Sequence, residues 1–220
     1  MGFNAVQYQD WDFDGKSLSR GYELNGSLQL KNYWNMNAGI FAASHNVSNG
    51  DLRGGPAFHY PGEVNTWLNV STDSRKKLTV SVNPRWRKGG HDFMEALDLN
   101  FGLTYRPTNA LNVSLQPGIS SNRNELQYVT TLTNANGGDS YVVGSIDQQT
   151  LRMTLRATYM VTPNLSIQYW GQPFGTAGSY TSFKFVNQAN ADEYADRFQS
   201  IPDNQLTLVD NVYHIDENLD

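Results

Sequence analysis

Residues 162–174 constrain the fold most strongly, because apolar and uncharged polar side chains alternate along them. Leu165 and Ile167 share one parity, while Ser166 and Gln168 share the other. A period of two is typical of a β-strand that shields one face from water. The polar positions carry an amide and a hydroxyl rather than the Lys and Glu of a water-washed sheet, which favours lipid on one side and a wet lumen on the other.

The same alternation recurs along the chain between turn signals. Besides the strand that follows the turn at 162–164, we expect strands at residues 3–9, 18–31, 34–44, 64–72, 78–87, 93–105, 111–116, 126–132, 141–146 and 151–161. A chain crossing a membrane as a barrel needs only about nine to eleven residues in each strand. The pattern therefore predicts an all-β fold, an antiparallel up-and-down transmembrane β-barrel that is incomplete, with about nine to eleven strands in a single domain over residues 1–220.

The connections between these strands differ at their two ends. Short turns at residue 32 and at 73–76, 106–109 and 162–164 fall at one end. Longer loops, such as residues 46–62, fall at the other. Outer-membrane barrels show this asymmetry, with short periplasmic turns and long outside loops.

Two regions are expected to lie outside the membrane. Residues 126–132 and 141–146 are too short to cross a bilayer and predict a hairpin standing above it. Residues 175–220 break the alternation. They predict a Gly-rich loop into a short strand, a short helix within 190–199 that caps the mouth, and an acidic tail from residue 203.

Composition narrows the class of protein further. Charged residues make up 17% of the chain, against roughly 25% in ordinary soluble domains. The mean hydropathy of -0.54 and the lack of a long apolar run exclude a transmembrane helix but not a transmembrane barrel. A net charge of -5 without a basic stripe predicts no nucleic-acid partner. The absence of Cys excludes disulfides, thiolate metal sites and Cys nucleophiles.

A soluble up-and-down barrel or sandwich would also alternate and stays open as an alternative. Arg20 and Glu95 occupy the apolar parity close to the long-loop end. A lipid-facing Arg or Lys costs roughly 2–4 kcal/mol at the midplane but about 0–1 near an interface, so this placement favours the membrane. Two aromatic girdles are also expected, one of Tyr33, Trp34, Tyr105 and Tyr159 at the short-turn end and one of Trp86, Phe93 and Trp170 at the other.

The polar parity supplies the candidate lumen residues. They are Glu23, Asn25, Arg85, Asp98, Asn100, Gln116, Arg152, Arg156 and Gln168. Glu23 and Asp98 are the carboxylates with which a glycosidase pair could be built, but no spacing brings them together, and ion pairs with lumen arginines are favoured. The sequence predicts no catalytic residue. His45, His59, His91 and His214 are scattered without the spacing of metal ligands.

Calcium is the only cofactor for which the sequence offers candidates. Asp10, Asp12, Asp14 and Gly15 match the opening of a calcium loop, but its twelfth position is Gly21 rather than Glu. Plain turn chemistry of the Asx type is the favoured interpretation. Asp216, Asn218 and Asp220 begin a second loop of this kind at the end of the chain.

Several motifs resemble one protein family. They are residues 162–174, Tyr180, 182–184 (SFK), 196–198 (DRF), 128–131 (YVTT) and 30–34 (LKNYW). Together they resemble the C-terminal barrel of the bacterial domain-of-unknown-function family 5916. The resemblance implies an outer-membrane protein of Bacteroidota and related bacteria, usually with a carbohydrate-binding-like β-sandwich ahead of the barrel.

The chain departs from that family pattern at both ends, since neither the sandwich module nor closing strands after the acidic tail are found. We therefore expect a piece of a longer polypeptide, because an unclosed barrel exposes unpaired backbone groups to lipid. The expected partners are the lipid bilayer and, only through the N-terminal module, saccharides.

Three functional classes remain open. The first is an outer-membrane barrel that acts as a pore or as an envelope platform, with a possible link to glycan handling. The second is a carbohydrate-active enzyme, which would need clustered carboxylates in one cleft. The third is a soluble ligand-binding β-barrel, whose inward residues would be the aliphatic ones.

Overall fold

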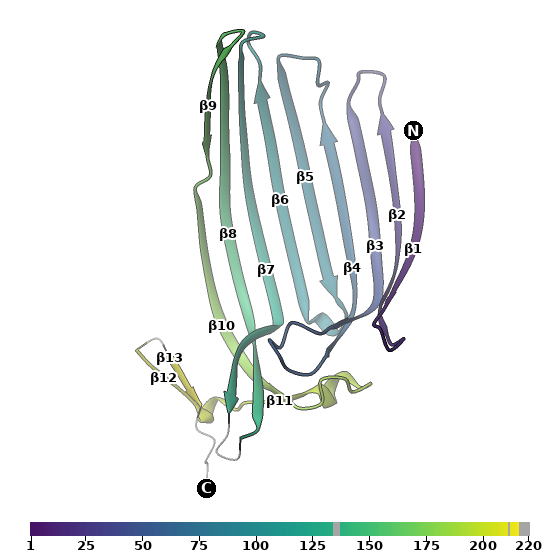
Figure 1. Ribbon diagram of the computed structural model, residues 1–220, viewed down its shortest axis with the longest axis vertical. Helices are drawn as coiled ribbons and strands as arrows, with labels where there is room; N and C mark the ends of the chain where they lie inside the picture. The colour runs from purple at the N-terminus through teal and green to yellow at the C-terminus, as the bar shows by residue number, and fades with distance from the viewer. Residues whose placement is uncertain (134–136, 211, 216–220) are drawn as a thin grey trace.

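The computed structural model describes residues 1–133, 137–210 and 212–215, and most of them form one antiparallel sheet (Figure 1). Eleven strands build this sheet in the order β1-β2-β3-β4-β5-β6-β7-β8-β10-β11, with β9 also paired to β8. They are β1 (Gly2–Trp11), β2 (Ser17–Gln29), β3 (Asn35–Ser48), β4 (Phe58–Ser71), β5 (Leu78–Gly89), β6 (Met94–Tyr105), β7 (Leu111–Thr133), β8 (Asp139–Thr162), β9 (Leu165–Gly171), β10 (Phe174–Val186) and β11 (Phe198–Ser200). The predicted all-β, antiparallel, up-and-down topology is confirmed.

The sheet is open. Its edges are β1 on one side and β9 with β10 on the other, and they lie apart (Figure 1). Among the described residues β1 pairs with β2 alone. This sheet is not closed into a barrel.

The turns after β2, β4, β6 and β8 lie together at one end of the sheet, which we call the short-turn end (top of Figure 1). The connections after β1, β3, β5 and β7 lie at the opposite, long-loop end. The connections at the long-loop end have five, nine, four and five residues, and those at the short-turn end have five, six, five and two, so the predicted difference in length is confined largely to the β3–β4 loop and the β8–β9 turn.

Several strands are longer than the sequence pattern indicated. The four short strands expected between residues 111 and 161 belong to two continuous strands, β7 and β8, which extend past their neighbours at the long-loop end (Figure 1). Register shifts at Asn124/Gln127 and Tyr128/Thr130 interrupt the alternation of side chains there. The sequence pattern therefore ends at these positions, although the strand continues. β3 and β4 likewise continue through residues 45–48 and 58–63, which were predicted as loop.

The prediction of a Gly-rich loop at residues 175–180 was wrong, because these residues belong to β10. This strand pairs with β8 from Phe174 opposite Arg152 to Phe185 opposite Val142. Its Gly and Ala residues have low intrinsic strand preference, so pairing with β8 decides the conformation of this segment. β9 pairs with the part of β8 nearer the short-turn end, and Pro173 separates β9 from β10.

The dry core of the molecule lies at the long-loop end. Leu52, Phe58, Phe93, Met94, Ala96, Leu126, Val143 and Ala189 form it, and a smaller cluster contains Val142, Phe183 and Ile201. The predicted short helix near residues 190–199 is a 3-10 turn, η2 (Tyr194–Arg197). A second 3-10 turn, η3 (Asp203–Gln205), leads to the hairpin of β12 (Leu206–Val209) and β13 (Val212–Ile215).

The two faces of the sheet differ in chemistry, because the register keeps residues of one parity together. One cross-strand row on the face that we call the apolar face consists of Leu28, Met36, Val70, Val82 and Phe101. Phe101 is 47% exposed, and Ile167 on the same face is 61% exposed. Leu99, Leu115 and Leu155 are partly exposed as well. These aliphatic residues of the apolar face therefore do not meet in a dry interior.

Within the described residues, no helix has both the length and the apolar character needed to cross a membrane.

Candidate functional site

The opposite face of the sheet, the polar face, carries all nine residues predicted to face a lumen. The register places Arg85 opposite Asp98, and it places Gly118 between Asn100 and Arg152. Arg156 and Gln168 have the same parity in β8 and β9, as do Glu23 and Asn25 in β2 and Gln116 in β7. That this face lines a lumen remains a prediction.

Arg152 ties three strands of the polar face together. Its guanidinium donates a hydrogen bond of 2.7 Å to Asn100 Oδ1 and lies 3.6 Å from the Asp98 carboxylate. Between these residues lies Gly118 of β7, where an added Cβ would come within 2.6 Å of Asn100 Oδ1. The arginine reaches β6 because the intervening strand has no side chain at this position.

Two aromatic rings cover glycines on the same face. Tyr8 and Phe41 stack with centroids 5.4 Å apart over Gly21. Trp67 of β4 lies over Gly39 of β3. Aromatic side chains that lie over glycines of neighbouring strands help to fix the strand register. They also fill the space that the missing glycine side chains would leave empty.

The carboxylates of the polar face are not arranged as a glycosidase pair. Glu23 lies in β2 and accepts a 2.6 Å hydrogen bond from Asn25, while Asp98 lies in β6 with Arg152. Four strand spacings separate β2 from β6, on the order of 19 Å along the sheet. Glycosidases need carboxyl groups roughly 5–9.5 Å apart.

The Asp10 to Asp14 turn is explained without a metal. Asp12 Oδ1 accepts hydrogen bonds from the backbone N–H groups of Asp14 and Lys16, at 3.0 and 2.8 Å, as in an Asx turn. Asp10 accepts a separate 2.6 Å bond from Ser19. In the described part of the chain, no group of three acidic, His or Cys side chains could hold a metal ion. The second calcium candidate, Asp216, Asn218 and Asp220, lies outside the described residues.

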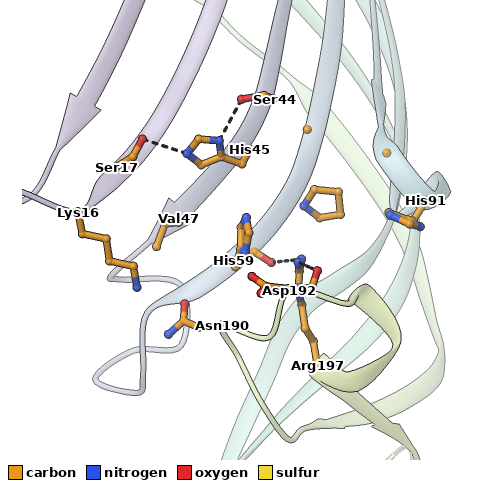
Figure 2. Close-up of a pocket in the computed structure, with 13 residues that line it drawn as sticks. Lys16, Ser17, Ser44, His45, Val47, His59, His91, Asn190, Asp192 and Arg197 are labelled. Atoms are coloured by element: carbon orange, nitrogen blue, oxygen red, sulfur yellow. Dashed lines mark hydrogen bonds between the residues drawn. The ribbon is translucent and has the colours of Figure 1, made fainter.

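A pocket of about 640 Å³, the mouth pocket, opens at the long-loop end on the side of the polar face. The strands and the β1–β2 turn contribute Lys16, Ser17, Ser44, His45 and His59 to its wall. The 3-10 turn η1 (Gly90–Asp92), between β5 and β6, contributes His91, and the segment after β10 contributes Asn190, Asp192 and Arg197 (Figure 2). Two distant parts of the chain meet here because β3 and β4 extend beyond their neighbours while the segment 187–197 packs beneath them.

His45 and His59 hold different positions in the mouth pocket. The His45 ring is fixed by two serines, with Nε2 3.2 Å from Ser17 Oγ and Nδ1 3.0 Å from Ser44 Oγ (Figure 2). The His59 ring stands edge-on to it at 5.9 Å. Desolvation lowers the pKa of the His59 imidazole, and the charges of Arg197, His45 and Lys16 lower it further, while Asp192 raises it.

Arg197 joins the segment 187–197 to β4. Its guanidinium donates to the backbone carbonyls of Ala191, His59 and Asp192, at 2.7, 2.7 and 3.0 Å. The residue is 4% exposed. His59 N–H donates in turn to the Ala189 carbonyl at 3.0 Å, so both backbone groups of His59 bind the segment.

A family model described as Domain of unknown function (DUF5916) matches residues 4–217 of the chain. The chain belongs to the DUF5916 family. The resemblance predicted from the motifs is thereby confirmed over almost the whole sequence. No curated protein and no solved structure matches it.

Two motifs of this DUF5916 chain have a visible structural role. Residues 30–34 form the β2–β3 turn, in which Tyr33 adopts a positive φ of 63° and receives the Arg75 guanidinium over its ring. Residues 196–198 contain Arg197, which holds the floor of the mouth pocket. These motifs specify turns and anchors rather than a reaction.

The predicted aromatic girdle at the long-loop end was partly wrong. Phe93 is buried in the core, and Trp170 lies opposite Arg156 on the polar face. Trp86 is on the apolar face as expected, where its Nε1 donates to Glu95 at 3.2 Å. Trp170 shares the parity of Gln168, and β9 ends at Gly171, opposite Leu155 and well before the long-loop end.

Sequence reasoning also missed the mouth pocket of the DUF5916 chain. His45, His59 and His91 were interpreted as scattered loop residues, but the structure brings all three to one pocket. His59 has the parity of Asn65 and Trp67 in β4. If the alternation of β4 is extended towards the N-terminus through residues 58–63, His59 falls on the polar face. This pattern could have predicted its place in the pocket.

Proposed function

We propose that the DUF5916 chain forms the wall of a bacterial outer-membrane β-barrel, with the apolar face against lipid and the polar face toward an aqueous lumen. The observation that carries this proposal is the uncovered apolar face. The described residues expose 14336 Å², whereas a compact soluble protein of 24.7 kDa exposes about 10,100 Å². A single sheet with one apolar face needs a second layer, and acyl chains can supply it.

A row of charged residues is consistent with one edge of the proposed lipid-facing band. At one height on the apolar face, the register aligns Lys88, Glu95, Arg123 and Asp147 on four successive strands. Glu95 and Tyr105 enclose the apolar residues of β6, and the distance between them is about 34 Å along the strand. At a tilt of about 40° this corresponds to about 26 Å of thickness, close to the roughly 25 Å band of outer-membrane barrels.

The proposed role is that of a pore or an envelope platform. The polar face carries amide and ionic contacts, of which Arg152 with Asn100 and Asp98 is one. Such contacts suit a hydrated lumen, whose residues tune what passes. On the family resemblance, we place the protein in a Bacteroidota-type envelope and assign any contact with saccharides to a module outside this chain.

Cysteine accessibility tests the orientation directly, because the chain has no native Cys. Leu115→Cys and Gln116→Cys place thiols on neighbouring positions of opposite faces. In lipid vesicles, a charged methanethiosulfonate reagent should modify the thiol at position 116 and react with position 115 only after the vesicles are dissolved in detergent. Equal modification of both positions in intact vesicles would sink the proposal.

Liposome swelling then separates the two roles. Sugars of graded size should enter vesicles that contain a pore, with a sharp size limit. A platform whose lumen is closed should admit none of them.

A further inference from the structure

The mouth pocket has an excess of basic side chains. Lys16, His45, His59, His91 and Arg197 line it, and Asp192 is the acidic residue in its wall. Clefts lined by one sign of charge concentrate ligands of the opposite sign. Burial is the main reason why the His59 pKa is lowered, and the neighbouring basic groups Arg197, His45 and Lys16 lower it further, while Asp192 raises it.

Arg197 is the strongest reason to expect an anion. Its guanidinium is buried, and the groups to which it donates are neutral backbone carbonyls. Among the described residues, none of the ion pairs includes Arg197. The carboxylates of Asp192 and Glu193 act on it electrostatically, but without an ion-pair contact. A buried charge without a direct counter-ion is costly, so an anion in the adjoining pocket would be stabilised by it.

The groups that can contact such an anion line the rest of the mouth pocket. Lys16 and the His59 ring face the pocket, and Ser17 and Ser44 hold the His45 ring between them (Figure 2). These are charged and hydroxyl donors within one cavity, and its volume suits a small ligand.

We propose that the mouth pocket binds a phosphate group, with Lys16 and His59 as direct ligands and Arg197 as a fixed charge beneath it. Phosphate is favoured over a carboxylate because it carries up to two charges and several acceptor oxygens, which suit several cationic groups at once. The proposal does not depend on the orientation of the sheet in a membrane.

The test is calorimetric titration of the folded protein with inorganic phosphate at about pH 7, where the anion carries more than one negative charge and a neutral His59 ring can still donate its N–H. Lys16→Met and His59→Gln should each weaken binding about tenfold, the loss expected for one charge-assisted hydrogen bond. Lys77→Met and His214→Gln are matched controls, because Lys77 lies in a turn at the opposite end and His214 in β13. Both controls should bind phosphate like the unmodified protein.

Two results would overturn the proposal. One is the absence of saturable phosphate binding in the unmodified protein. The other is equal affinity in the pocket variants and their controls. Because neither result concerns lipid, failure here leaves the cysteine-accessibility test of the proposed function unaffected, and the reverse also holds.

A second titration with sn-glycerol 1-phosphate identifies the source of the phosphate group. Tighter binding of this compound than of inorganic phosphate, lost in Lys16→Met, indicates a lipid headgroup. Equal or weaker binding indicates free phosphate as the ligand.

Discussion

Arg152 of β8 donates a hydrogen bond to Asn100 of β6 although a whole strand lies between them. The contact is possible because β7 presents Gly118 at the crossing point. It links the polar residues of β6 and β8 across β7.

Gly118→Ala should therefore destabilise the sheet. Its Cβ would meet Asn100 Oδ1 at 2.6 Å and Arg152 Nε at 3.1 Å, so the Asn100 amide must move and its hydrogen bond with Arg152 is disturbed. We expect a loss of about 1–3 kcal/mol in the free energy of unfolding, as for other overpacked sites. Urea titration of the folded protein measures it. Gly175→Ala is the matched control, because nothing lies within 4 Å of its added Cβ, and an equal loss in both variants would contradict the role of Gly118.

A charge placed on the two faces of β7 should have opposite consequences. Ile119 lies on the apolar face between Leu99 and Leu151, and Ser120 lies on the polar face opposite Asp98. Ile119→Arg should cost about 2–4 kcal/mol of stability in lipid vesicles, because the guanidinium would lie near the midplane. Ser120→Arg should be tolerated. Reversible unfolding in vesicles gives both values, and a tolerated Ile119→Arg argues against lipid contact.

Replacing the Arg197 guanidinium should weaken the attachment of the segment 187–197 to β4. Arg197→Lys keeps the charge but cannot donate to three carbonyls in the same geometry. We expect faster exchange of the His59 amide, because its N–H donates to the Ala189 carbonyl in this segment. Hydrogen exchange with mass spectrometry measures it. Arg106→Lys, in a turn at the short-turn end, should leave that exchange unchanged.

The stability of the long-loop end should depend on pH through His59. Its pKa is lower in the folded protein than in the unfolded chain, so the unfolded state binds more protons as the solution is acidified. The contribution of neutral His59 is therefore fully present above about pH 6.5 and is lost as the pH falls through the lowered value. Melting temperatures should fall over that range in the unmodified protein. The fall should be smaller in His59→Gln, and identical profiles would exclude His59 as its cause.

The alternation of side chains was enough to predict much of this fold. Residues such as Leu165, Ile167 and Leu99 could be assigned to one face, and Arg152 and Gln168 to the other, because strand geometry alternates side chains with a period of two whatever surrounds them. The short turns and the family motifs were also readable in the chain. Local chemistry determines each of these features.

Other features required the tertiary structure. Residues 175–180 became strand through pairing with β8, because their Gly and Ala residues have little strand preference of their own. The mouth pocket depends on contacts between His59 and Arg197, which are 138 positions apart, and on a backbone carbonyl as the acceptor. Sequence determined which side chains share a face, since that follows from neighbouring residues alone. Only the packing of distant segments decided where a charge is buried and which groups meet around it.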